Sequence, residues 1–182
     1  DMVRQLQADD SINGYLNLRI ESAKLLNVDK EPCSVQLMII PDGSEVEDYI
    51  RMENLDGTSA HLGDDGILIT QNATRILGLK TGGTVFLQNM ELEQYEVAVS
   101  GIVRNYLGNN VYMTQKLYEA SFGEYVPNGV LAGLSDACID QSTYAEALRD
   151  NDSVLSIVST AALREEFGFD LINAIVLLLI VM

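Results

Sequence analysis

Histidine and paired acidic side chains are the residues of this chain that could support catalysis or metal binding. His61 is the only histidine, and no Gly-x-Ser-x-Gly nucleophile elbow accompanies it. We therefore expect His61 to be a solvated loop residue and not a member of a hydrolase triad. Asp9-Asp10 and Asp64-Asp65 lack the alternating ligand spacing of a calcium loop, so we interpret both pairs as solvated surface charge. No catalytic, metal-binding or cofactor-binding residue is predicted, and the residues that would contact a substrate are left unassigned.

The segment 78–84 superficially resembles a phosphate-binding loop. Its sequence is Gly-Leu-Lys-Thr-Gly-Gly-Thr, but no lysine follows the second glycine, and the segment leads from a helix to a strand. A phosphate loop needs the opposite order, in which a strand leads into a helix. We therefore interpret Gly78 as a helix C-cap followed by a turn, and we predict no nucleotide site.

The two cysteines, Cys33 and Cys138, are too far apart in the sequence for a CxxC redox pair or a zinc knuckle. Two buried free thiols are the favoured interpretation, because cysteine is among the most often buried residue types. A single bridge between them remains the alternative, since spacing alone does not fix disulfide geometry.

Composition indicates one acidic, globular domain. The chain has 182 residues, of which 47% are hydrophobic and 21% charged, enough to bury a core and too apolar for a disordered chain. The formal net charge is -16, from 11 Lys+Arg and 27 Asp+Glu. Because that charge repels a phosphate backbone, nucleic acid is excluded as the expected partner.

The elements that must position these residues are short and mixed in type. Alternation and apolar runs predict strands at 16–20, 35–40, 67–69, 84–87, 94–106, 111–113, 129–134 and 154–158. Helices are expected at 2–6, 46–50, 70–77, 114–122, 142–149 and from 160 onward, and Ser44 with Glu47 predicts a capping box for the second. Strands and helices do not alternate strictly, which favours an α+β fold.

The apolar tail is the most distinctive physical feature. Leu171–Met182 carries one strongly polar residue, Asn173, and is shorter than the about 20 residues that span a bilayer. A buried final helix or strand competes with the first turns of a transmembrane helix. We favour the helix, with residues 169–182 as its start, because the run has no polar face. The acidic flank, Glu165, Glu166 and Asp170, places the domain outside the cytoplasm. We also expect the chain, which opens at Asp1 without a signal peptide, to be a segment of a longer protein.

The middle of the chain resembles a known family. Residues 66–85, Gly-Ile-Leu-Ile-Thr-Gln-Asn-Ala-Thr-Arg-Ile-Leu-Gly-Leu-Lys-Thr-Gly-Gly-Thr-Val, are similar to the strand–helix–glycine–strand segment of FtsX-like, MacB-like ABC transporter permeases. Residues 99–106 and 111–123 resemble further segments of the same extracytoplasmic domain, in the same order. Gly83 replaces the aspartate that is commoner at this turn in the family.

The resemblance implies a fold and a location. It implies a MacB-like core domain at 1–168, with mixed, largely antiparallel sheets. Within it, a porter-like lobe at 1–50 and 115–168 would carry an inserted, mostly β lobe at 51–114. The domain would lie on the extracytoplasmic side of a bacterial cell membrane.

The resemblance also implies a function in which this chain catalyses no reaction. Such a domain is not an enzyme and needs no cofactor. It couples transmembrane helix motion, driven by a separate cytoplasmic ABC ATPase subunit, to substrate export or to an extracytoplasmic protein, peptide or lipid. A second permease subunit, identical or different, would complete the transporter. An extracytoplasmic ligand-sensing module of an unrelated membrane protein remains the alternative, and an enzyme is a third class.

Overall fold

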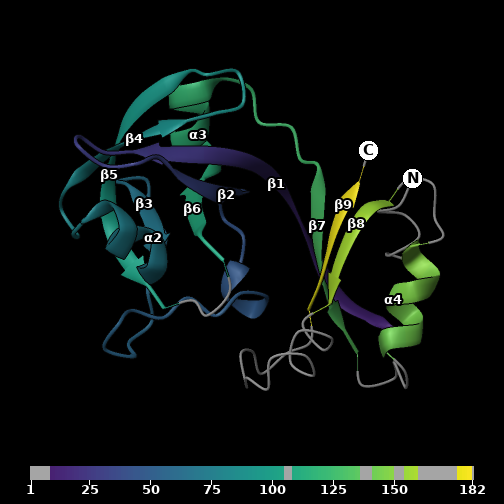
Figure 1. The fold of residues 1–182 in the computed structure, drawn as a ribbon. Helices are drawn as coiled ribbons and strands as arrows, with labels where there is room; N and C mark the ends of the chain where they lie inside the picture. The colour runs from purple at the N-terminus through teal and green to yellow at the C-terminus, as the bar shows by residue number, and fades with distance from the viewer. Residues whose placement is uncertain (1–8, 105–107, 136–140, 150–153, 160–175, 182) are drawn as a thin grey trace. The chain divides into compact units, whose positions relative to one another are not determined.

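The computed structural model describes residues 9–104, 108–135, 141–149, 154–159 and 176–181 (Figure 1). The fold is α+β, as predicted, with mixed strand pairing and short helices. In chain order the elements are β1 (Ile12–Leu26), β2 (Cys33–Ile40), η1 (Val46–Asp48), β3 (Ile67–Thr70), α2 (Gln71–Leu77), β4 (Thr84–Gln88), β5 (Gln94–Val103), β6 (Asn110–Thr114), α3 (Gln115–Phe122), β7 (Gly129–Leu134), α4 (Gln141–Arg149), β8 (Val154–Ser159) and β9 (Val176–Val181).

Packing divides the chain into two compact units. Unit 1 consists of Asp1–Leu18, Glu45–Arg51 and Pro127–Met182, and unit 2 of Arg19–Ser44 and Met52–Val126. Strand β1 contributes its first seven residues to unit 1 and the rest to unit 2. The lobe boundaries implied by the family resemblance, 1–50 with 115–168 and 51–114, remain a prediction.

Unit 2 is built on a closed ring of strand pairs. Strand β2 pairs with β1 and β6, β6 with β3, β3 with β5, β5 with β4, and β4 with β1. The β2–β6 and β3–β5 ladders are parallel, and the other four are antiparallel. Residues buried at alternate positions, such as Val97 and Val99 on β5, fill the interior, as a half-buried strand requires. Helices α2 and α3 both pack on β2, and their Leu77 and Tyr118 belong to the same core.

Unit 1 contains an antiparallel sheet. The first part of β1 pairs with β7, β7 with β9, and β9 with β8, while α4 packs on β8. All six residues of β7 are buried. The run Gly-Val-Leu-Ala-Gly-Leu therefore has the continuous apolar character expected of a strand covered on both faces.

The structure of the apolar tail differs from the predicted one. Val176–Val181 form strand β9, with Leu178 paired to Leu131 on β7 and to Val158 on β8, and not the start of a transmembrane helix. An apolar run of this length is also compatible with an interior strand, and periodicity does not separate the two. The remaining residues of the expected 169–182 segment lie outside the described residues. Within the part of the chain that the structure describes, no helix combines the length and apolar character needed to cross a membrane.

Local boundary signals were mostly confirmed. Gly78 ends α2 with a left-handed backbone, φ 66°, and the Thr114 hydroxyl caps α3 by accepting from the Leu117 amide. The predicted capping box is wrong: the Ser44 hydroxyl donates to the Pro41 carbonyl, and only the short 3₁₀ turn η1 follows. The residue at the N-cap of η1 is Glu45, whose side chain makes no capping hydrogen bond. The helices expected at 2–6 and from 160 fall outside the described residues.

Candidate functional site

His61 and the second acidic pair lie on the surface of unit 2. His61, Asp64 and Asp65 are all exposed. Asp64 accepts hydrogen bonds from the Lys116 ammonium at 2.6 Å and from the Thr114 hydroxyl at 2.7 Å. These two contacts lower the pKa of Asp64 and keep it ionised. Asp64 therefore takes part in a surface ion pair at the start of α3.

The first acidic pair has a structural role in unit 1. Asp9 accepts from the Tyr144 hydroxyl at 2.7 Å and from the Ser11 amide at 2.9 Å, and both contacts lower its pKa, the tyrosine more strongly. The Asp10 carbonyl accepts from the Ser135 hydroxyl at 2.9 Å. Among the described residues, no group of three His, Cys, Asp or Glu side chains is placed to hold a metal ion.

The glycine-rich segment uses its amides within the protein. The Gly82 N–H donates to the Val99 carbonyl at 2.8 Å, and the Gly83 N–H donates to the Lys80 carbonyl at 3.0 Å. A phosphate loop directs such amides at its ligand. The segment 78–84 is thus a turn from α2 into β4, as its residue order indicated.

Cys33 is a buried free thiol at the start of β2. Its Sγ lies 3.5 Å from the Asn109 side-chain amide nitrogen, and burial raises the pKa of the thiol. A raised pKa keeps the sulfur protonated and weakly nucleophilic. Cys138 lies outside the described residues.

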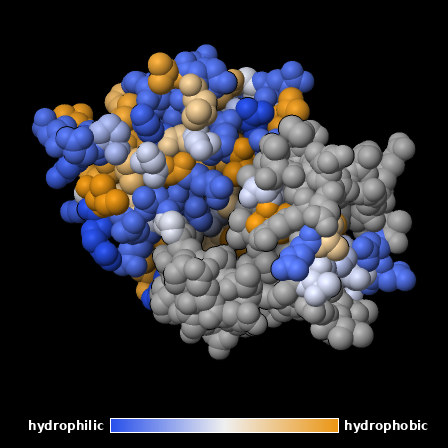
Figure 2. All heavy atoms as spheres, turned by 45° about the vertical axis from the view of Figure 1, so that its right-hand side comes forward, coloured by the Kyte–Doolittle hydropathy of each residue, from blue (hydrophilic) through white to orange (hydrophobic). Residues whose placement is uncertain are grey.

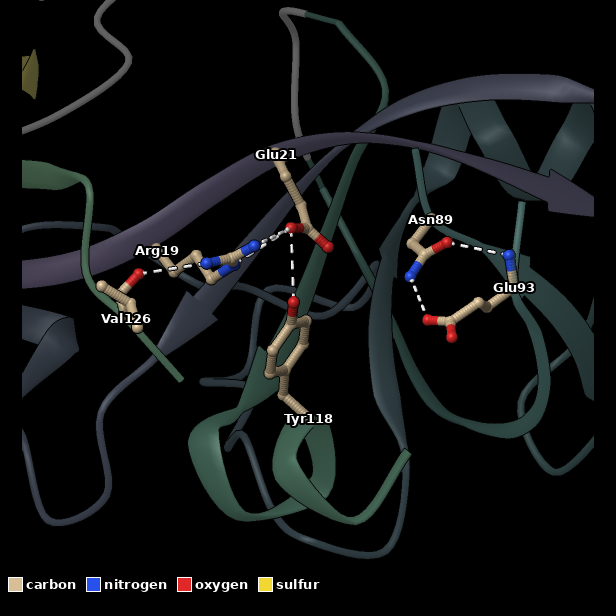
Figure 3. Close-up of polar contacts among 6 residues, drawn as sticks. All are labelled: Arg19, Glu21, Asn89, Glu93, Tyr118 and Val126. Carbon is tan, nitrogen blue, oxygen red and sulfur yellow. Dashed lines mark hydrogen bonds and ion pairs between the residues drawn. The ribbon is translucent and has the colours of Figure 1, made fainter. Parts of the chain in front are cut away.

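A buried polar cluster in unit 2 is the candidate site (Figure 3). On β1, Glu21 Oε2 accepts from Arg19 Nε at 3.0 Å and forms an ion pair with Arg19 Nη2 at 2.9 Å. The Tyr118 hydroxyl on α3 donates to the same oxygen at 3.4 Å. Arg19 Nη1 also donates to the Val126 carbonyl at 3.3 Å. Glu21 and Arg19 side chains are 12% and 25% exposed, so the pair is largely removed from water.

The ion pair contacts the first of three packed aromatic rings. The Arg19 guanidinium lies 5.4 Å from the Tyr118 ring centroid, within cation–π range. Phe122 packs on Tyr118 at a centroid distance of 5.5 Å and meets Tyr95 edge-on at 4.6 Å. The rings lower the local dielectric constant and strengthen the electrostatic interactions beside them.

The cluster shifts the pKa values of its members. Burial, and then the negative charge of Glu21, raise the pKa of Tyr118. Burial acts to lower the pKa of Arg19, but the hydrogen bond and charge of Glu21 outweigh it and raise that pKa. Burial raises the pKa of Tyr125 to about 12, against a smaller opposing effect of Arg19. At neutral pH the tyrosines are therefore neutral donors and Arg19 is a cation.

One carboxylate oxygen of the cluster accepts no hydrogen bond. Glu21 Oε1 is inaccessible to solvent and is the single buried side-chain oxygen or nitrogen, among the described residues, without a hydrogen-bond partner. An unsatisfied acceptor on a buried carboxylate is unfavourable, and an N–H or O–H donor brought to it would be bound well. The arrangement suits recognition of a donor group and has no nucleophile–base pair.

This cluster was not predicted from the sequence. Arg19 and Glu21 were expected on the polar face of a half-buried strand, opposite Leu18 and Ile20. The signal that could have found them is the phase of β1 beyond residue 21. Ala23 and Leu25 share the face of Glu21 and are buried in the unit 2 core, so this face points inward.

Comparison with known proteins gives structural likenesses. No protein-family model and no curated protein matches the chain. It is similar to the extracellular domain of the noncanonic ABC-type transporter YknZ from Gram-positive bacteria, with 17% identity and TM-score 0.49, covering 93% of this chain and 83% of that one. The periplasmic region of MacB from Actinobacillus actinomycetemcomitans matches with 15% identity and TM-score 0.47, covering 92% and 73%. A domain of a putative permease protein from Porphyromonas gingivalis matches with 11% identity and TM-score 0.46, covering 96% and 80%. At these identities and TM-scores the likenesses do not assign a function to this chain.

Proposed function

We propose that the chain is the extracytoplasmic domain of an FtsX-like ABC transporter permease of a bacterial cell membrane. The observation that carries the proposal is the segment 66–85, whose sequence resembles that family. The segment folds into the strand, helix, glycine turn and strand that the resemblance implies: β3, α2, a left-handed Gly78 and β4. The match covers the helix-ending glycine as well as the hydrophobic pattern, although Gly83 departs from the family's usual aspartate in the turn before β4.

The proposed role is to transmit motion and not to catalyse a reaction. A cytoplasmic ABC ATPase subunit would supply the energy, and a second permease subunit would complete the transporter. Unit 1 carries both ends of the chain, whereas unit 2 is reached through four chain crossings, at 18/19, 44/45, 51/52 and 126/127. In a domain inserted between transmembrane helices, unit 1 would receive their motion and these four segments would pass it to unit 2.

Topology is the first test of the proposal. In the full-length protein, Val28→Cys places a thiol at a side chain that is 75% exposed. We expect a membrane-impermeant maleimide to label it in intact cells. The unsubstituted protein is the control for labelling of the native Cys33 and Cys138, of which Cys33 is buried with a raised pKa and should react slowly. Labelling that requires permeabilised cells would contradict the extracytoplasmic location.

Association with an ATPase is the second test. Full-length protein purified in detergent should bring with it an ABC ATPase subunit and show ATP hydrolysis. The separated domain should show none. Full-length protein that purifies without any ATPase, and whose membranes gain no ATPase activity on its expression, would contradict the coupling role.

A ligand-sensing module is the second candidate, and the unpartnered Glu21 Oε1 favours it. A cationic amine is the chemical class that would complement this oxygen and the surrounding rings. Titration of the protein with putrescine or choline, followed by thermal unfolding, tests it. Sensing predicts a concentration-dependent rise in melting temperature that Glu21→Gln weakens, whereas the permease proposal requires no such rise.

A further inference from the structure

The turn between β4 and β5, residues 89–93, is held rigidly by one asparagine. This turn is called the hairpin tip below. Asn89 is only 7% exposed, and its side-chain nitrogen donates to Glu93 Oε2 at 2.8 Å while its Oδ1 accepts from the Glu93 amide at 2.9 Å (Figure 3). Backbone bonds join the Asn89 amide to the Glu93 carbonyl and the Leu92 amide to the Asn89 carbonyl. Four hydrogen bonds thus fix five residues.

This fixed turn presents two large apolar side chains to solvent. Met90 is 68% exposed and Leu92 is 71% exposed. Leu92 has φ 66°, a left-handed backbone that is sterically unfavourable for a residue with a Cβ. The four hydrogen bonds maintain that conformation although the leucine side chain gains little burial from it. Conformations held against their local preference cluster at recognition sites.

Elsewhere the exposed apolar groups are separated along the chain. Val28, Leu55, Ile76 and Val126 are exposed singly, each in a different segment, and Phe86 and Tyr95 are exposed on the strands β4 and β5 that flank the tip. On the face drawn in Figure 2, apolar groups of the described residues are dispersed among hydrophilic ones. Single exposed apolar residues are normal on a protein surface, whereas two that lie only two positions apart in one turn are a stronger indication of a contact surface.

The charge around the tip indicates which class of partner it would bind. Glu91, Glu93 and Glu96 are exposed, and no lysine or arginine occurs between residues 89 and 96. On the neighbouring strand β1, exposed Lys24 pairs with Gln88 at the base of the tip, so the three glutamates still outnumber the nearby cation. Anionic lipid, nucleic acid or a second copy of a chain with formal net charge -16 would be repelled. A protein surface with an apolar socket rimmed by lysine or arginine would be attracted.

We propose that the hairpin tip is a docking site for such a basic protein partner, with Met90 and Leu92 as the anchors. Methionine adapts its shape to irregular apolar sockets, and the rigid turn reduces the entropy lost on binding. The flanking glutamates orient the encounter and speed association. This inference stands on the tip alone and does not depend on the transport function.

The test uses a defined probe in place of the natural partner. A fluorescent helical peptide with a leucine stripe flanked by lysines presents the proposed chemistry. Two control peptides replace either the lysines by glutamates or the leucines by serines. We expect measurable binding to the first peptide, weakening with salt, and roughly tenfold weaker binding to either control, since anchors and charge act together.

Variants locate the binding to the tip. Met90→Ser combined with Leu92→Asn removes both anchors, and asparagine tolerates the left-handed backbone, so the fold should be retained. The matched control is Val28→Ser, because Val28 is as exposed as Leu92 but lies in the turn after β1. The double variant should bind the leucine–lysine peptide roughly tenfold more weakly than the control, at an unchanged melting temperature.

Several outcomes would overturn the proposal. Equal binding by the double variant and the control would place the contact elsewhere. Equal binding of the glutamate peptide would remove the charge argument. Flotation of the wild-type chain, but not the double variant, with phosphatidylglycerol vesicles would make the tip a membrane anchor. Loss of a wild-type dimer in the double variant would make it a self-association surface.

Discussion

Gly66→Ala tests the closest backbone approach in unit 2. Gly66 is buried directly before β3, and a Cβ added there would lie 2.5 Å from the Ala98 carbonyl oxygen and 3.0 Å from the Ser100 amide nitrogen. Ordinary contact begins near 3.4 Å, so β5 would have to move by about 0.9 Å, and the nearby Ile67–Val99 pairing would be strained. Overpacking costs about 1–3 kcal/mol, and a weakened ladder hydrogen bond adds about 1. We expect a loss of about 2–4 kcal/mol.

Gly63→Ala is the matched control. Its added Cβ would lie 2.7 Å from Asp65 Oδ1, but that atom ends an exposed side chain that can rotate away. Neither glycine has a positive φ, so backbone strain does not distinguish them. Urea unfolding of both variants, followed by circular dichroism, should leave Gly63→Ala within about 0.5 kcal/mol of the parent. Equal stability of the two variants would show that β3 and β5 do not approach as described.

Three further predictions concern the helix cap, pH and the tail. Gly78→Val should lower the free energy of unfolding by about 1–2 kcal/mol, because valine disfavours the left-handed backbone at the end of α2; an unchanged melting temperature would contradict it. The pKa of Tyr125, raised from 10 to about 12, adds stability that is complete below pH 10 and falls as the pH approaches 12. Between pH 10 and pH 12 the free energy of unfolding should fall by about 1–2 kcal/mol, after allowing for partial exposure of the side chain. Urea titrations across this pH range should show no such fall for Tyr125→Phe. Deleting residues 176–182 should abolish cooperative unfolding of unit 1, since β8 would lose its strand partner and β7 would keep only β1; an intact transition would restore the transmembrane interpretation.

Strand positions could be predicted from the sequence because a half-buried strand alternates apolar and polar residues. The segment Gln94–Val103 shows inward Val97, Val99 and Val103 at period two, and the glycine after α2 needs a backbone that glycine alone adopts readily. These features depend on neighbouring residues only. Ring closure by the β4–β1 pairing is not encoded locally, because Leu25 and Leu87 are 62 positions apart in the sequence.

The tail shows where local pattern fails. The run from Val176 to Val181 is apolar at every position, so a buried helix, a membrane helix and an interior strand share the same pattern. Its state is decided by partners more than forty residues earlier in β7 and by β8, which is separated from β9 by sixteen residues. Tertiary pairing thus overrides a composition that looked decisive.

The site formed by Arg19 and Glu21 was not predicted for a different reason. Opposite charges at alternate positions of a strand usually mark a solvated face, yet here both contact Tyr118, whose ring packs on Phe122. The aromatic partners come from α3, almost a hundred residues later, and no local signal announces them. Charge on a strand therefore identifies a site only once the opposing element is known.

The two features that suit recognition occur in the same unit. The unsatisfied Glu21 oxygen and the hairpin tip from Asn89 to Glu93 both belong to unit 2, whereas both ends of the chain belong to unit 1. Glu21 is already paired with Arg19, so its free oxygen favours a hydrogen-bond donor, whereas the exposed glutamates of the tip favour positively charged groups. Under the proposed transport function, we expect binding at unit 2 to be connected to the ATP hydrolysis that drives the transporter. Variants at the tip that alter ATP hydrolysis by the full-length protein, with topology and assembly unchanged, would demonstrate that connection directly.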